Sequence, residues 1–282
     1  MESILTRSVV MFKTFFTIWV FSGLLGCDGA VNNSTICKNN PEVCADLHKD
    51  SWCRYEKSDL IKNRLRLKHE QTPSGKELYL HLTYLEKYNK CVELASGVKH
   101  ILHPERSNDR ARAFGLSAQS LAELQASTKD SNDIHLAFYH WTRFNNSAAL
   151  EKVLRAQRLN LIDDIDILAR VASYFQKFNP SKAKTIYLEV LNRSEASNVN
   201  PDWLLGLANT YQKTNEFELT YLLSRANILM SDHDVSEKSM SALVNGDNAV
   251  QSRLDEQAEA LVDALESGNY PSSNIKLILE KN

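Results

Sequence analysis

Apolar residues recur every three or four positions along most of the chain, which is the spacing of one face of an α-helix. The pattern predicts helices over residues 52–69 and 76–102, and Pro73 and Gly75 mark the turn between them. These two helices are expected to form an antiparallel hairpin. A third helix is predicted over 107–128, with an apolar face formed by Ala111, Phe114, Ala118 and Leu121.

From residue 133 onward the sequence repeats itself. FNNSAALEKVLRA at 144 and FNPSKAKTIYLEV at 178 share Phe, Asn, Ser and Ala at an offset of 34 residues, and ASYFQK at 172 returns as ANTYQK 36 residues later. Each copy predicts two helices, and the second helix carries three small or apolar residues spaced by four and then three. The triplets are Ala149, Val153, Ala156; Ala183, Tyr187, Val190; and Leu219, Leu223, Ala226. This spacing places each triplet on one helical face.

A period of 34 to 36 residues with two helices per unit resembles the tetratricopeptide repeat. The residues that stand where that family places its packing side chains are Leu207, Ala208, Tyr211, Ala183 and Tyr187. Leu219 departs from the pattern, because the family has a small residue there. The resemblance implies an α-solenoid over about 132–231, and the alternative is an irregular bundle of similar hairpins. One more amphipathic helix, marked by Leu254, Ala258, Leu261, Val262 and Leu265, is expected to cap the array.

The N-terminal segment has the layout of a signal peptide. Arg7 and Lys13 precede an uncharged run of 13 residues, Thr14 to Gly26, which is shorter than the roughly 20 residues that span a bilayer. Leu24-Leu25-Gly26-Cys27 resembles the bacterial lipobox, which implies lipidation of Cys27 and anchoring of the mature chain in a membrane. Asp28 resembles the residue that retains such proteins in the inner membrane, facing the periplasm. A plain secretory signal and an uncleaved anchor are the alternatives.

The remaining cysteines are Cys37, Cys44, Cys53 and Cys91, an even number that is expected to form two disulfides outside the cytoplasm. Cys53 lies 20 residues before Pro73 and Cys91 lies 18 after it. At about 1.5 Å per residue, the hairpin places these two at nearly the same level. We therefore predict Cys53–Cys91 and Cys37–Cys44. The spacings match no usual zinc site, and no CxxC pair indicates a catalytic dithiol.

Several segments resemble a family of lipoproteins of Gram-negative bacteria that is defined only as a domain of unknown function. They are PEVC at 41–44, WCRYEKSDLI at 52–61 with Arg64, LEKYNKCVELA at 85–95 and HW at 140–141. The resemblance implies no activity. The expected organisation is a signal peptide at 1–26, an acylated cysteine, tether and Cys-rich lead-in at 27–51, the hairpin at 52–106, the helical repeats at 107–231, and a capping helix and tail at 232–282.

Composition narrows the function. The chain has 33 Lys and Arg against 35 Asp and Glu, so we expect no nucleic-acid partner. Only 9 Gly and 6 Pro among 282 residues disfavour a turn-rich β fold and favour an all-α protein. The first hairpin helix carries the charged residues Arg54, Glu56, Arg64 and Arg66, expected mostly on a solvated face, with a buried ion pair as the alternative.

Histidines offer two candidate sites. His100 and His103 suggest a metal site, but a solvated helix end before Pro104 is the expected reading. His135, His140 and Asp133 suggest a triad, but no nucleophile motif accompanies them, and His140 is expected in the core. A Walker lysine, GxGxxG and HExxH are also absent from the sequence, so we expect no cofactor or metal and favour a non-enzymatic role.

Helical repeats commonly bind other proteins along a concave surface. We therefore expect an adaptor or scaffold that binds a protein or peptide, with Arg143, Arg170 and Lys177 on the first helices as groove candidates. The competing hypothesis is a cell-envelope enzyme that acts on peptidoglycan or lipid, with a site near Glu56. A purely structural tether is the third alternative.

Overall fold

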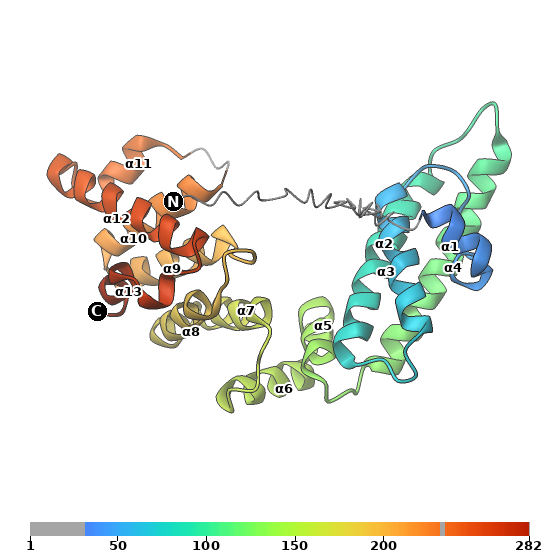
Figure 1. The fold of residues 1–282 in the computed structure, drawn as a ribbon, viewed down its shortest axis with the longest axis horizontal. Coiled ribbons are helices and arrows are strands. Elements are labelled where there is room, and N and C mark those ends of the chain that lie inside the picture. The colour runs from blue at the N-terminus through green and yellow to red at the C-terminus, as the bar shows by residue number, and fades with distance from the viewer. Residues whose placement is uncertain (1–31, 232–234, 282) are drawn as a thin grey trace, which may run out of the picture.

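Residues 32–231 and 235–281 of the computed structural model are described below, and they form helices and turns without a β-strand. The elements, in chain order from one end of the molecule to the other (Figure 1), are α1 (Asn33–Asn39), η1 (Pro41–Val43), α2 (Arg54–Lys68), α3 (Gly75–Ser96), α4 (Pro104–Thr128), α5 (Ile134–Phe144), α6 (Ser147–Arg158), α7 (Ile165–Phe175), α8 (Pro180–Arg193), α9 (Pro201–Lys213), α10 (Phe217–Met230), α11 (Glu237–Ala242), α12 (Asn248–Glu266), η2 (Tyr270–Ser272) and α13 (Asn274–Glu280). The predicted all-α class is confirmed. The signal peptide and Cys27 lie outside the described residues.

Polar caps determine where many of the helices begin. Before α3, the Ser74 hydroxyl accepts a hydrogen bond from the Glu77 amide, and the Glu77 carboxylate accepts one from the Ser74 amide, which is a complete capping box. Asp or Asn side chains cap α1, α5 to α9 and α12 in a similar way. Helix α3 is shorter than the predicted 76–102, because it ends at Ser96 and residues 97–103 form a loop.

Helices α1 to α4 form an N-terminal unit around one apolar cluster. Leu60 and Ile61 of α2 pack against Leu85 and Val92 of α3. The lead-in joins them through the bidentate ion pair of Arg64 with Asp46, whose two contacts measure 2.6 and 2.7 Å. Of the charged residues on this helix, Arg64 therefore fits the alternative of an ion pair that is largely buried against the hairpin.

Helix α4 also belongs to the N-terminal unit, whereas we predicted from the sequence that residues 107–128 belong to the helical repeats. It packs along α3, and Ala113 lies in the same cluster as Val92. The predicted face is rotated as well, because Ala111 is exposed while Arg110 and Ser117 are buried. Helical periodicity predicts that a charged residue lies on the surface. It contains no information on Asp50 and the Ala95 carbonyl, whose hydrogen bonds allow Arg110 to be buried.

Three antiparallel helix pairs follow: α5 with α6, α7 with α8, and α9 with α10. The residues of the three predicted triplets are all buried, and all of them except Ala183 belong to one large apolar cluster that runs through these helices. Between the second and third pairs, the backbone at Gly206 of α9 approaches the Tyr187 ring of α8 so closely that a β-carbon would collide with it. Close packing of neighbouring pairs therefore builds a continuous core.

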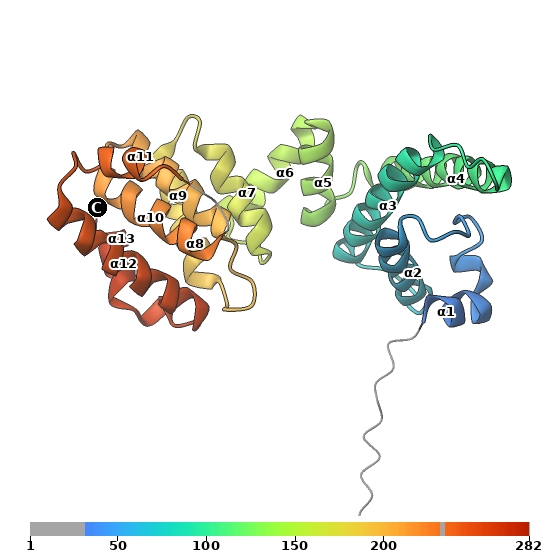
Figure 2. The same ribbon diagram turned by 90° about the horizontal axis from the view of Figure 1, so that it is seen from above.

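Helix α12 covers the end of the series by packing on α10, as Figure 2 shows from above. Leu254, Ala258, Leu261 and Leu265 are buried, and the predicted capping helix is confirmed. The sequence did not indicate α11 or α13. The Tyr211 hydroxyl of α9 donates a hydrogen bond to the Leu279 carbonyl, which fixes α13 beside the third pair. Within the described part of the chain, the helices are either too short or too polar to cross a membrane.

Candidate functional site

A cleft of about 430 Å³ opens between the first and second helix pairs. One wall is built by Trp141 of α5 and Leu150 of α6, and the other by Tyr174 of α7 and Phe178 of the following turn. The Trp141 and Tyr174 rings meet edge to face with centroids 5.6 Å apart, and Tyr174 meets Phe178 in the same way at 4.9 Å. Such aromatic pairs give the cleft a rigid apolar surface.

Positive charge lines this apolar surface. Arg170 and Lys177 are exposed side chains at the cleft, and Asn145, Ser147 and Ser173 supply the other polar groups. Among the described residues, neither Arg170 nor Lys177 forms an ion pair, and the lining contains no carboxylate. Helix α6 begins at Ser147, so the partial positive charge of its N-terminus lies at the same place. The cleft therefore suits a ligand that combines negative charge with an apolar group.

Arg143, the third groove candidate, does not line this cleft. Its Nε atom lies 3.1 Å from both carboxylate oxygens of Glu86 on α3, and its guanidinium lies 5.8 Å from the Tyr139 ring. Arg143 and Lys177 occupy equivalent positions in the 34-residue repeat. Their surroundings differ because Arg143 lies against α3 of the N-terminal unit, whereas Lys177 lines the cleft opposite the first helix pair. Arg170 and Lys177 therefore line the cleft and Arg143 does not, and a role of these residues in binding stays a prediction.

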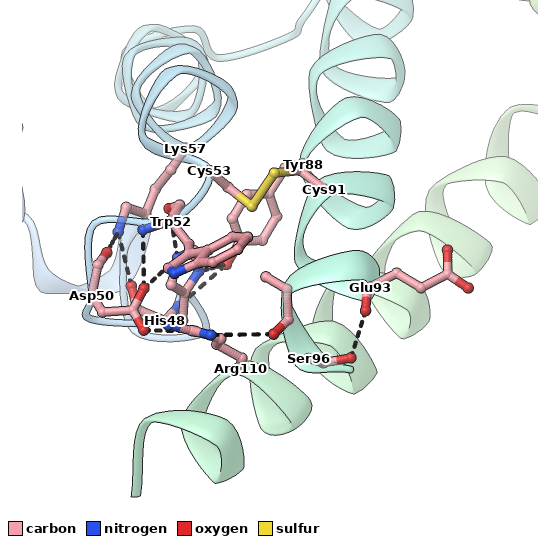
Figure 3. Close-up of a disulfide and its surroundings, with 11 residues drawn as sticks. His48, Asp50, Trp52, Cys53, Lys57, Tyr88, Cys91, Glu93, Ser96 and Arg110 are labelled. Carbon is pink, nitrogen blue, oxygen red and sulfur yellow. Dashed lines mark hydrogen bonds and ion pairs between the residues drawn. A yellow bond between two sulfur atoms is a disulfide. The ribbon is translucent and has the colours of Figure 1, made fainter. Parts of the chain in front are cut away.

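The second concentration of polar side chains surrounds the Cys53–Cys91 disulfide (Figure 3). His48 is buried, and its Nε2 donates to the Trp52 carbonyl at 2.7 Å. In the neutral ring Nδ1 then accepts the Tyr88 hydroxyl at 2.9 Å. Lys57 donates to the backbone carbonyl of Asp50 at 2.6 Å. These bonds fix the short lead-in segment against α2 and α3.

A buried guanidinium completes this cluster. The Arg110 Nε atom donates to the Asp50 carboxylate at 2.7 Å, and its NH1 donates to the Ala95 carbonyl at 3.3 Å. The Trp52 ring lies 4.9 Å from the guanidinium. Only 1% of the Arg110 side chain is exposed, so these partners replace nearly all of its hydration.

The pKa shifts in the cluster follow from burial and from its bonds. Burial, followed by the charge of Lys57, lowers the pKa of His48, so its ring is neutral at pH 7. Burial raises the pKa of Tyr88 to about 12. Burial would also raise the pKa of Asp50, but the Trp52 amide and Arg110 outweigh it and hold that pKa below its usual value. The groups are thus fixed in the protonation states that their bonds require, which is typical of a structural network.

The disulfides join Cys37 to Cys44 and Cys53 to Cys91, with Cα–Cα distances of 5.6 and 5.8 Å. This is the pairing that the hairpin levels predicted. The half-buried Glu56 carboxylate lies within 4.8 Å of the sulfur atoms of Cys53 and Cys91. Because both sulfurs are bonded to each other, they are not available as thiolate ligands. Glu56 does not line the aromatic cleft.

The histidines of the triad alternative have different partners. His140 is buried and lies 3.1 Å from the Thr128 hydroxyl, so its predicted place in the core is confirmed. His135 lies 3.6 Å from Asp133 and 3.5 Å from Asp164, two carboxylates that cap α5 and α7. Hydrogen bonding to His135 lowers the pKa of Asp164 to about 2. His135 and the two carboxylates therefore connect the N-termini of α5 and α7, and this group of three residues contains no nucleophile.

Sequence reasoning missed the aromatic wall of the cleft. Trp141 and Tyr174 belong to successive helix pairs, and the sequence alone predicts that each lies in the core, as large aromatic residues usually do. The exposed Phe178 gave a signal, because it belongs to the repeated Phe-Asn motif that follows the first helix of each of two copies. Only the packing of one pair on the next brings these rings together.

The fold and the cleft define an all-helical protein whose paired helices carry a cationic, aromatic cleft. Residues 24–225 match the family described as "Protein of unknown function (DUF2989)", and the chain belongs to this family. The match includes α5 to α8, so the cleft lies inside the family domain. No curated protein and no solved structure matches the chain.

Proposed function

We propose that this protein is a lipid-anchored adaptor that faces the periplasm and binds an acidic peptide segment of a partner protein in the cleft between α5 and α7. The observation that carries the proposal is the pair of cations, Arg170 and Lys177, that line an aromatic cleft without a carboxylate partner among the described residues. An acidic side chain of the partner would pair with them while a neighbouring apolar side chain contacts Trp141 and Tyr174.

A peptide is favoured over a small metabolite because the cleft is an open surface between successive helix pairs. Small-molecule sites bury most of their ligand. Helix pairs that resemble tetratricopeptide repeats instead present extended surfaces to a chain that crosses several units. The exposed Phe178 and Lys177 at the rim support a contact with a ligand longer than the cleft itself.

The anchor is proposed from the N-terminal sequence. Cys27 follows an apolar run in a lipobox-like context, and Asp28 favours retention in the inner membrane over the outer membrane. Two disulfides are typical of a protein that folds in an oxidising compartment, which supports a location outside the cytoplasm. A lipid on Cys27 would hold the helical body close to the membrane surface.

The test is a selection of random peptides displayed on phage against the immobilised full chain. We expect the selected peptides to be enriched in Asp or Glu next to aromatic or aliphatic residues. A double variant, Arg170→Glu with Lys177→Glu, should bind them at least about tenfold more weakly, because two favourable charge contacts become repulsive.

The matched control is Lys90→Glu with Lys238→Glu, which makes the same change in net charge at exposed positions on α3 and α11. The control should retain the wild-type Kd. Selection of peptides without acidic enrichment, or equal weakening by both double variants, would contradict the proposed site.

A further inference from the structure

The loop between α3 and α4 exposes an unusual set of apolar side chains. Ile101 is 93% exposed and Leu102 is 83% exposed, and they follow Leu94 at 71% and Val98 at 43%. Exposed apolar residues are common singly, but a contiguous group marks a surface that contacts a partner or a membrane. Residues 94–102 are called the apolar tip below.

The loop is held in this exposed form. The Ser107 hydroxyl accepts a hydrogen bond from the His100 amide at 2.9 Å and donates one to the Val98 carbonyl at 3.3 Å. Pro104 occupies the first turn of α4, where its fixed φ suits the start of a helix. These local bonds shape the chain around Ile101 and Leu102 without burying either side chain.

Two exposed aromatic residues lie at the same end of the N-terminal unit. Trp52 is 45% exposed and Tyr55 is 67% exposed at the start of α2. The Cys53–Cys91 disulfide joins this point to α3, one turn before Leu94. In Figure 1 the start of α2 and the α3–α4 loop lie toward the same end of the four-helix unit. Trp and Tyr are the residues enriched at the level of lipid headgroups.

We propose that the apolar tip inserts into the surface of a lipid bilayer. Ile101 and Leu102 would enter the boundary between headgroups and acyl chains, and Trp52 and Tyr55 would lie at headgroup level. The exposed Lys99, between Val98 and Ile101, is placed to meet lipid phosphates. The partner that suits the tip is therefore a bilayer surface with anionic headgroups above apolar acyl chains.

The covalent path of the chain supports this partner. Asn33 begins α1 and lies beside α2, with its side-chain oxygen 3.4 Å from the Ser58 hydroxyl. Cys27 precedes Asn33 by six residues, which span at most about 20 Å. A lipid on Cys27 would thus hold the end of the molecule that carries the tip near the membrane. The inference rests on this anchor but not on peptide binding by the cleft.

The experiment places a reporter at the tip of the full chain. The Ile101→Trp variant is reconstituted into vesicles of phosphatidylethanolamine and phosphatidylglycerol, with or without bromine on the acyl chains. The wild-type spectrum is subtracted to remove the native tryptophans. Bromine quenches only rings that reach the acyl region, so we expect the added emission to fall by at least about half.

The matched control is Leu159→Trp, at a site that is 57% exposed in the turn between α6 and α7. Its emission should be the same in both kinds of vesicle. Equal, weak quenching of the two variants would overturn the membrane contact. Because both substitutions keep an apolar residue at an exposed position, neither is expected to impair folding.

Mass spectrometry of the same samples shows whether Cys27 carries lipid. If Cys27 is acylated but the I101W emission is not quenched, the proposed insertion of the apolar tip is wrong and the proposed lipid anchor is retained. Quenching without acylation would support the tip and overturn the anchor. The second expected result is that a chain carrying Ile101→Trp together with Val98→Asp and Leu102→Asp loses this quenching, because the charged side chains keep the tip out of the acyl region.

Discussion

The two ends of this molecule are stabilised in different ways. The N-terminal unit, α1 to α4, contains two disulfides, a buried arginine and a bidentate ion pair around a small apolar cluster. The helix pairs from α5 onward share one large apolar cluster. Their described residues contain no disulfide. A short lead-in with little apolar surface of its own requires cross-links and polar bonds, whereas stacked pairs are stabilised by contact with their neighbours.

The difference also separates the proposed roles. The polar groups around Cys53–Cys91 are paired with one another, so they are committed to structure. In the helix pairs, Arg170 and Lys177 form no ion pair among the described residues, and we propose that an external partner pairs with them. The N-terminal unit is accordingly proposed as the membrane-proximal part, and the helix pairs as the part that binds a ligand.

The largest expected effect is that of Arg110→Ala. This change leaves the Asp50 carboxylate without its guanidinium partner in a largely buried site, so we expect a loss of about 3 to 5 kcal/mol in the stability of the N-terminal unit. Hydrogen exchange of the α2, α3 and α4 amides measures it. Arg112→Ala on the same helix is the control, because its side chain is 42% exposed and its 2.9 Å ion pair with Asp109 therefore stays partly hydrated. A loss no greater than that of the control would contradict the structural role of Arg110.

The disulfides should differ in their contributions. Cys53 and Cys91 are 38 residues apart, whereas Cys37 and Cys44 are 7 apart. On the loop-entropy model, replacing the first pair by alanine costs about 4 kcal/mol and replacing the second about 2.5 kcal/mol. Urea unfolding of the two double variants, with hydrogen exchange to locate the change, compares them. Equal losses, or losses located in α7 to α10, would show that the cross-links do not stabilise the unit as described.

A smaller effect is expected from pH. Burial, followed by the charge of Arg64, lowers the pKa of His81 to about 4, below the ordinary value near 6.5. Between pH 6.5 and 4, His81 is therefore protonated in the unfolded chain but neutral in the folded protein. The free energy of unfolding falls as the pH is lowered through this range. We expect the His81 contribution to fall by about 1 kcal/mol over this range, since the ring is partly accessible.

The His81→Gln variant isolates this contribution. Its stability, measured by urea unfolding between pH 4 and 7, should fall less steeply than that of the wild type. Parallel profiles for the two proteins would mean that His81 does not carry the acid sensitivity. His48 and His140 are retained in both proteins, so their shared contributions cancel in the comparison.

Local patterns in the sequence predicted much of the fold. The axial positions of Cys53 and Cys91 were enough to pair four cysteines, because both residues belong to one hairpin. The repeated triplets identified the buried faces of α6, α8 and α10, because their spacing depends only on helix geometry. These features need no knowledge of distant contacts.

Other features depend on contacts between segments far apart in the chain. Arg110 is buried because Asp50 and the Ala95 carbonyl lie beside it, and helical periodicity carries no trace of either partner. Arg143 pairs with Glu86 of α3 and does not line the cleft, whereas the equivalent Lys177 forms no ion pair within the described part of the chain. The sequence therefore indicated two of the cations that line the candidate cleft, whereas its aromatic walls became visible only where Trp141 of α5 meets Tyr174 of α7.

The most direct test of the central claim, that Arg170 and Lys177 bind an acidic peptide, is a charge swap measured by titration calorimetry. A peptide selected on the wild type is compared with a version in which each acidic residue is replaced by lysine. The swapped peptide should bind the wild type weakly and recover affinity for the R170E and K177E double variant, as expected of a direct charge contact. Recovery on the K90E and K238E control as well, or on neither, would contradict the assignment of the cleft.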